Sequence, residues 1–232
     1  MTDQALQWLL HGTIAVAGGQ LAVREVVGNA FGLASALLGM RRVVWAWPVG
    51  LVGNTLLFTV FVTGELGGST GGEPLWGQAG RQLMFVAVGL YGWWRWSAAG
   101  RSRAGDDGGA VAPRWAGATE RLQLLGLAVL GYAAAYALLS AIGSWGPATE
   151  AWILAGSLLA TWGMARGYVE FWLVWIAVDV VGVTTLVQAG YYPTAAMYLF
   201  YGAFCVVGLL TWWRASRRVV EVAATTKEEV LR

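Results

Sequence analysis

Asp179 lies deep within a long apolar stretch of this sequence, Val169–Gln188. An ionisable side chain in such a setting normally faces a partner or a solute, because its charge is costly to bury in apolar surroundings. Trp172 and Trp175 precede it by seven and four residues, so all three side chains fall on one face of a helix. Two indoles beside one hydrogen-bond acceptor suit a flat ring that carries polar substituents.

Further polar side chains occur at helical spacing in other apolar stretches. Amide, phenol and carboxyl groups that face a common axis suit a solute with several hydroxyl groups. Trp47 lies near the end of its stretch, where a membrane-interface role and a cavity role are equally compatible with its position. The candidate substrate-binding residues are Trp172, Trp175, Asp179, Asn54, Gln78, Gln82, Tyr198, Tyr201 and Trp47.

Residue counts exclude several kinds of chemistry. Cys205 is the only cysteine and His11 the only histidine, so neither an internal disulfide nor a bis-histidine haem site can form. Lys227, the single lysine, lies in the polar tail, which leaves no intramembrane lysine for a retinal Schiff base. The sequence has no P-loop and no nucleophile–histidine pair. We therefore expect no enzyme activity and no cofactor or metal, and the net charge of +2 is too small to indicate nucleic-acid binding.

The composition places these residues in a bilayer. Of the 232 residues, 57% are hydrophobic and 12% are charged, against roughly 45–50% and 25% in soluble domains. So short a soluble chain has too few charges to cover its apolar surface. Disorder is excluded by the aromatic content, which includes 15 Trp.

Stretches of about 20 mainly apolar residues predict an all-α membrane protein with seven spans. These are Val23–Met40, Val44–Thr63, Trp76–Trp96, Leu122–Ala141, Glu150–Ala165, Val169–Gln188 and Tyr192–Trp213. With the N-terminus outside, 13 of the 15 basic residues fall in cytoplasmic segments, and only Arg24 and Arg81 do not. Cytoplasmic loops carry the excess of Lys and Arg, so the orientation N-out, C-in is expected.

The spans divide the chain into five segments. Residues 1–22 are an N-terminal extracellular segment without the basic start of a signal peptide, and Ala5–Val16 is expected to form a short interfacial helix. Residues 23–97 and 150–214 form two three-helix repeats, separated by a cytoplasmic loop and linker helix at 98–149. Residues 215–232 form a cytoplasmic tail. We expect Ser97–Thr119 to be a solvated loop and the chain after Arg217 to be loose.

The two repeats emerge when the sequence is aligned with itself. At an offset of 125, Trp47 meets Trp172 and Asn54 meets Asp179, and at an offset of 119, Trp93-Trp94-Arg95 meets Trp212-Trp213-Arg214. One linker span gives both copies the same orientation, a 3+1+3 parallel arrangement. Parallel repeats of this kind occur in transporters with a site near the membrane midplane between the halves.

Two motifs resemble a known family. The strings Trp45-Ala46-Trp47-Pro48-Val49-Gly50 and Gly89-Leu90-Tyr91-Gly92-Trp93-Trp94-Arg95-Trp96 are similar to the Pnu-type bacterial vitamin transporters, over about residues 24–214. The resemblance implies a fold akin to full-length SWEET sugar facilitators, usually as a homotrimer in the bacterial cytoplasmic (inner) membrane. It also implies facilitated diffusion of an unphosphorylated vitamin that a cytoplasmic kinase then traps.

The same resemblance bears on the substrate. Nicotinamide riboside members carry W-x-x-W followed by Asn, whereas this chain has Trp172, Trp175 and then Asp179. The string Ala165-Arg166-Gly167-Tyr168-Val169-Glu170-Phe171-Trp172 is similar to the riboflavin-transporting (RibM or PnuX) branch, which favours riboflavin. From physics alone, cationic nicotinamide riboside and thiamine remain open, because Asp179 attracts a cation equally well. A seven-helix receptor or membrane subunit without transport is the alternative of a different class.

Overall fold

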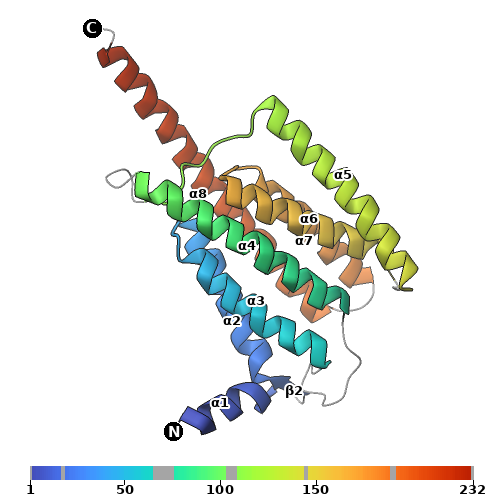
Figure 1. Cartoon of the computed structure of the whole chain (residues 1–232). Coiled ribbons are helices and arrows are strands. Elements are labelled where there is room, and N and C mark those ends of the chain that lie inside the picture. The colour runs from blue at the N-terminus through green and yellow to red at the C-terminus, as the bar shows by residue number, and fades with distance from the viewer. Residues whose placement is uncertain are drawn as a thin grey trace. The chain divides into compact units, whose positions relative to one another are not determined.

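The computed structural model describes residues 2–16, 19–64, 76–102, 109–143, 146–188 and 192–230. It divides into two compact units, Met1–Ala110 and Val111–Arg232. The first unit begins with helix α1 (Thr2–His11) and a hairpin of strands β1 (Thr13–Val16) and β2 (Gly19–Ala22). Helices α2 (Val23–Met40), α3 (Ala46–Thr63) and α4 (Trp76–Ser102) follow, and α3 packs against both α2 and α4 (Figure 1).

The second unit contains α5 (Ala118–Ala141), α6 (Pro147–Arg166), α7 (Phe171–Gln188) and α8 (Tyr192–Val230). Within it, α6 packs against α5 and α7, and α7 packs against α8 (Figure 1). The prediction of an all-helical protein is confirmed, and each of the seven predicted apolar stretches coincides largely with one of α2–α8. Among the described residues, the helical segments Ala46–Thr63, Ala118–Ala141 and Tyr198–Val219 have the length and hydropathy to cross a membrane.

The N-terminal segment differs from the expected helix Ala5–Val16. Helix α1 ends at His11, and residues 13–16 pair as an antiparallel strand with residues 19–22. Gly12 stands at this break, where a β-carbon would overlap the Trp8 carbonyl oxygen. The Gly12 carbonyl then accepts a hydrogen bond from the Val23 amide at 2.9 Å, which closes the hairpin against the start of α2.

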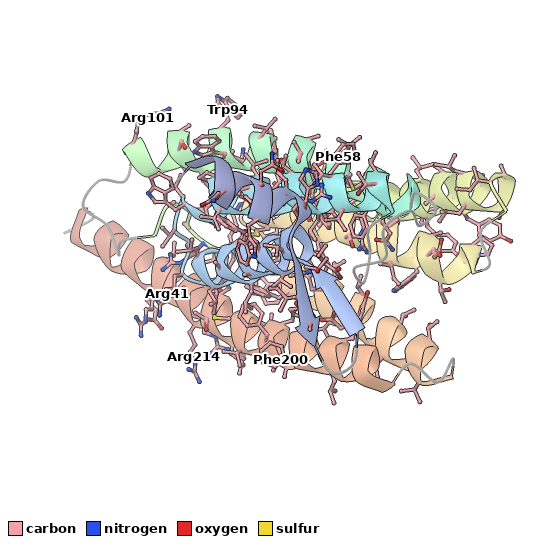
Figure 2. All side chains as sticks on the ribbon, turned by 90° about the horizontal axis from the view of Figure 1, so that it is seen from below. Arg41, Phe58, Trp94, Arg101, Phe200 and Arg214 are labelled. Atoms are coloured by element: carbon pink, nitrogen blue, oxygen red, sulfur yellow. The ribbon has the colours of Figure 1, made fainter. Side chains whose placement is uncertain are left out.

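Two helices run further than expected. Helix α4 continues to Ser102, and α8 continues to Val230, so the prediction of a loose chain after Arg217 is wrong. The sequence from Arg214 to Val230 contains neither Gly nor Pro, and nothing in it stops the helix. Figure 2 shows Trp94 and Arg101 on the outer side of α4, where both are exposed.

The expected solvated connection Ser97–Thr119 is only partly a loop: residues 97–102 belong to α4, residues 109–117 have defined contacts, and residues 103–108 lie outside the described part of the chain. Ala110, Val111, Pro113 and Ala116 are buried. In the first unit, the Ala110 amide donates to the Arg42 carbonyl at 2.8 Å. The backbone of the loop therefore has fixed partners rather than water alone.

In the second unit, the loop joins the α6–α7 turn as a short parallel bridge between Arg114 and Tyr168. The Arg114 amide donates to the Gly167 carbonyl at 3.0 Å, and its guanidinium forms two hydrogen bonds of 2.6 Å with Glu120. These bonds to Glu120 raise the pKa of Arg114 above its ordinary value. The Glu170 carboxylate accepts the Ala116 amide at 2.9 and 3.1 Å, which attaches the loop to the start of α7.

The α2–α3 and α6–α7 turns have the same backbone pattern, which agrees with the offset of 125. The Val43 amide donates to the Leu38 carbonyl at 3.0 Å, and the Tyr168 amide donates to the Gly163 carbonyl at 2.9 Å. The bonds from the amides of Arg42, Ala46, Trp47 and Val49 recur in the same way at Gly167, Phe171, Trp172 and Val174.

The two helices on either side of each turn pack through equivalent positions, but the small and the large residue change places between the two repeats. A β-carbon on Gly53 of α3 would lie 3.0 Å from the Phe31 β-carbon of α2. At the equivalent positions 125 residues later the small residue is Gly156 of α6, and the Val178 side chain of α7 fills the space above it. In each pair, one helix supplies the groove and the other the ridge, so the two helices of the pair approach each other closely.

The packing of the third helix of each repeat, α4 and α8, changes the alignment of the two repeats. Trp47 meets Trp96 edge-on at 5.3 Å between ring centroids, and Trp172 meets Trp212 edge-on at 6.3 Å. Trp96 and Trp212 are both fully buried. This packing equates Trp96 with Trp212, an offset of 116 (212 minus 96), so the expected offset of 119 is wrong by three residues.

Glycines support the corrected offset. The six-membered ring of Trp47 lies against Gly92, and that of Trp172 lies against Gly208, through the same three ring atoms. A β-carbon at either glycine would overlap the indole. Gly89, which the offset of 119 equated with Gly208, instead contacts mainly Leu51.

Candidate functional site

Asp179 is buried on the face of α7 that meets α8. Its side chain is 7% exposed, and its Oδ2 atom has no hydrogen-bond partner. A β-carbon on Gly202 of α8 would lie 3.6 Å from the Asp179 β-carbon and 3.8 Å from Oδ2. The carboxyl group is thus turned toward the second unit's own helices, with one oxygen left unpaired.

Trp172 occupies the same side of α7, seven residues or about two helical turns before Asp179. Its ring contacts Phe171 at 4.5 Å and Phe204 at 6.1 Å between centroids, besides Gly208 and Trp212. The indole is only 4% exposed, and its Nε1–H has no partner. The ring is therefore enclosed by its neighbours, and the polar group that it offers is the N–H.

Trp175, Tyr198 and Tyr201 are half-buried. The Tyr198 ring lies against Gly182, one turn beyond Asp179 on α7. Tyr201 directly precedes Gly202 on α8, the residue that lies against Asp179. The structure thus brings Asp179 and the two tyrosines of α8 into one neighbourhood of the second unit.

The first unit holds the remaining four candidates. Trp47 is 5% exposed on α3, between Gly92 and Trp96 of α4, and its Nε1–H has no partner. Gln82 is 3% exposed, and Gln78, one turn earlier on α4, is half-buried. The Oε1 atoms of both glutamines are buried without a partner. Asn54 is half-buried on α3.

Unpaired buried polar atoms mark five of the nine candidates. They are Trp47, Gln78, Gln82, Trp172 and Asp179. A buried polar atom without a partner costs about 1–3 kcal/mol, so native proteins seldom retain one unless a solute or an ordered water satisfies it. The atoms comprise N–H donors and carbonyl or carboxyl acceptors, which together suit a solute that has both kinds of group.

Comparison with known proteins identifies the family. The family model described as nicotinamide mononucleotide transporter matches residues 22–214. The chain belongs to the PnuC family of transporters. It is 36% identical over 215 residues, 92% of this chain and 95% of the relative, to the riboflavin/roseoflavin transporter RibM of Streptomyces davaonensis.

More distant relatives support the same family assignment. The chain is 22% identical to the nicotinamide riboside transporter PnuC of Escherichia coli strain K12, over 90% of this chain and 92% of the relative. The crystal structure of the vitamin B3 transporter PnuC matches with a TM-score of 0.63 at 21% identity, covering 84% of this chain and 82% of that one. The fold is therefore that of a helical membrane transporter, and these relatives are transporters rather than enzymes.

The second unit of this PnuC-family chain also contains an apolar cavity of about 270 Å³. It is lined by residues of α5, α6 and α7, among them Tyr132, Trp152 and Val178. None of the nine candidates lines it. With no charged side chain in its wall, it lacks the polar groups that orient a hydroxylated solute.

Sequence reasoning missed one residue beside Asp179. Cys205 of α8 is buried, at 7% exposed. It follows Gly202 by three residues, so both lie on the face of α8 that meets Asp179. In the sequence Cys205 served only to exclude a disulfide, because the spacing within α8 does not reveal which helix that face meets.

Proposed function

We propose that this PnuC-family protein imports riboflavin across the bacterial cytoplasmic membrane by facilitated diffusion. The observation that carries the substrate is the higher identity to a riboflavin/roseoflavin transporter than to a nicotinamide riboside transporter, over nearly the same share of the chain. The occurrence of Asp179 at a buried position of α7 is compatible with this choice.

The substrate-binding residues in this proposal are the nine candidates named from the sequence. Riboflavin offers a flat ring with carbonyl and imide groups and a ribityl chain with four hydroxyls. Asp179, Gln78 and Gln82 supply unpaired acceptors for its donors, and the indole N–H groups supply donors for its carbonyls. Asn54, Tyr198 and Tyr201 supply further polar groups.

The two tryptophans of α7 have different parts in this site. Trp172 contributes its N–H group and a rigid wall, because Gly208 and three aromatic rings already surround its indole. Trp175 is half-buried and is the residue assigned to stacking on the isoalloxazine ring. Trp47 has in the first unit the part that Trp172 has in the second.

The proposed transport cycle is alternating access through relative movement of two three-helix repeats, α2–α4 and α6–α8, with α5 as the linker. The matching hydrogen bonds of the two turns support the repeat. The distribution of basic residues supports seven spans with the N-terminus outside. A homotrimer, and trapping of the vitamin by a cytoplasmic kinase, follow from the family resemblance.

Uptake by purified protein in proteoliposomes tests the proposal. Radiolabelled riboflavin should enter without ATP or an ion gradient, and preloaded riboflavin should drive counterflow. Excess riboflavin should compete more strongly than nicotinamide riboside or thiamine. Stronger competition by either of the other two vitamins would reassign the substrate, and binding without counterflow would indicate a receptor.

A further inference from the structure

The apolar cavity of about 270 Å³ in the second unit lies between the neighbouring helices α5, α6 and α7 (Figure 1). Each helix contributes at least one alanine to its wall, namely Ala128, Ala155 and Ala177. Larger side chains at these positions would fill the space. The Trp152 Nε1–H group donates to the Ala177 carbonyl at 3.4 Å, so the indole is held between α6 and α7 at the cavity wall.

The cavity opens on the surface that this unit presents to the membrane. Helix α5 has the length and hydropathy to cross a bilayer, and most of its residues are not buried within the chain. Trp152 and Leu173 of the cavity wall are 43% and 45% exposed. Because the wall is almost entirely apolar, it offers water few hydrogen-bond partners. A hydrocarbon chain from the bilayer is the group that matches it.

A charged residue lies on the same face of α5 as the cavity. Arg121 precedes Ala128 by seven residues and Tyr132 by eleven, and both spacings return to one helical face. At 1.5 Å per residue, Tyr132 lies about 16 Å along the helix from Arg121. This length is close to half of a hydrocarbon core of about 30 Å, so the face from Arg121 to Tyr132 matches the depth of one lipid leaflet.

Helices α6 and α7 place charges at the same end of the cavity. On α6, Arg166 follows the cavity residue Leu159 by seven positions. Directly before α7, the Glu170 carbonyl accepts the amide of the cavity residue Val174 at 3.2 Å. Arg121 Nη2 lies 3.3 Å from Glu170 Oε1, so the charged ends of α5 and α7 meet in space.

The exposed part of this charged end is positive. Its ion pairs join three arginines to two glutamates, namely Arg114, Arg121, Arg166, Glu120 and Glu170. The side chains of Arg114 and Arg121 are 47% and 60% exposed, whereas those of Glu120 and Glu170 are 23% and 17% exposed. Guanidinium groups beside an apolar cavity suit a phosphate that carries a hydrocarbon chain.

We propose that one phospholipid binds along this face, with its phosphate at Arg121 and one acyl chain in the cavity between α5, α6 and α7. The site is separate from the nine candidate substrate-binding residues, so it stands whether or not riboflavin is the substrate. In the proposed orientation the lipid belongs to the cytoplasmic leaflet. Since the chain fills the space between the linker helix and the second repeat, bound lipid should raise the melting temperature of the protein.

The test is a titration of the delipidated full-length protein in detergent with dioleoyl phosphatidylglycerol, followed by native mass spectrometry. The wild-type chain should bind one lipid. Ala128→Phe places a ring in the cavity and should weaken binding by about tenfold or more, because the ring displaces several methylene groups. Gly126→Phe is the matched control: it adds the same ring to α5 where no atom lies within 4 Å of the β-carbon position, and it should bind like the wild type.

Arg121→Gln tests the phosphate contact. It should weaken binding by about two- to fivefold, the range of an exposed ion pair. Arg218→Gln, at an exposed position of α8, should leave binding unchanged. Oleate supplies a chain without a phosphate and should bind more weakly than the phospholipid. Wild-type affinity in Arg121→Gln, or equal binding of oleate, would overturn the proposed phospholipid.

Two outcomes would remove the acyl chain from the cavity. Wild-type affinity in Ala128→Phe would place the lipid elsewhere, and lipid-free oligomers that Ala128→Phe dissociates would assign the cavity to a second copy of the chain. A further measurement does not depend on the folding of Ala128→Phe. One equivalent of brominated phosphatidylglycerol should quench a larger share of the fluorescence of the wild type than of Trp152→Phe, and equal quenching of the two proteins would overturn the site.

Discussion

Arg42 and Gly167 occupy the same position in two equivalent turns, and both adopt a left-handed backbone conformation, with φ of 58° and 76°. Each carbonyl accepts an amide hydrogen bond from the loop before α5, from Ala110 to Arg42 and from Arg114 to Gly167. A left-handed conformation costs a residue with a β-carbon roughly 1–2 kcal/mol, and glycine far less. The first repeat thus carries a cost at this turn that the second avoids.

Substitutions at this position should have unequal effects in the two turns. Gly167→Ala should destabilise the protein by about 1–2 kcal/mol, with an added cost because its β-carbon would lie 2.8 Å from the Val111 side chain. Arg42→Gly should destabilise the protein less than Gly167→Ala, because the relief of backbone strain offsets the lost contacts of the Arg42 side chain, which packs against Gly109. Thermal unfolding of the purified protein in detergent measures both, and equal destabilisation by the two changes would contradict the argument.

The glycines beneath the tryptophans should be among the least replaceable of the described glycines. Gly92→Ala and Gly208→Ala place a methyl group within the rings of Trp47 and Trp172, and such overpacking costs about 1–3 kcal/mol. Gly80→Ala serves as the control within α4, because no atom lies within 4 Å of its β-carbon position. It should raise stability by about 0.5–1 kcal/mol through helix propensity. If Gly92→Ala and Gly208→Ala melt at the same temperature as Gly80→Ala, the tryptophan–glycine packing would be contradicted.

The Glu170 carboxylate should stabilise the loop chiefly through the Ala116 amide. Glu170→Ala removes the acceptor for a partly buried backbone donor, a loss of about 1–3 kcal/mol. Glu170→Gln keeps an acceptor oxygen and should cost less. Arg121→Ala removes an ion pair in which Nε and Nη2 each lie 3.3 Å from Glu170 Oε1. The arginine side chain is 60% exposed, and such pairs contribute about 0–1 kcal/mol. Limited proteolysis of the loop should follow the same order; a dominant effect of Arg121→Ala would assign the stabilisation to charge instead.

Asp179 should matter more for uptake than Arg218, an exposed arginine of α8. Asp179→Ala removes a buried acceptor, and hydrogen bonds to a charged group contribute about 1.5–3 kcal/mol, so affinity for riboflavin should fall about tenfold or more. Arg218→Ala, at an exposed position of α8, should leave uptake near the wild-type rate. Uptake at matched membrane abundance measures both, and wild-type transport by the Asp179 variant would exclude it from the site.

Much of this architecture follows from the sequence because the bilayer restricts backbone choices. Each long apolar stretch must satisfy its own hydrogen bonds as a helix, so α2 and the end of α3 coincide with the predicted bounds. The shared face of Trp172 and Asp179 follows from helical geometry alone. The offset of 125 could be recognised in the sequence because Arg41, Val44 and Trp47 recur in the same order 125 residues later, with no insertion between them.

Other features were decided by contacts across helices. The Trp-Trp-Arg strings of the third helices match in sequence because tryptophan and arginine both favour the membrane interface, whatever the register. The true register depends on which glycine leaves room for an indole, and only packing reveals that Gly92 and Gly208 do so. Gly202 of α8 is placed beside Asp179 in the same way, because the sequence specifies the face of each helix, whereas close packing selects which faces meet.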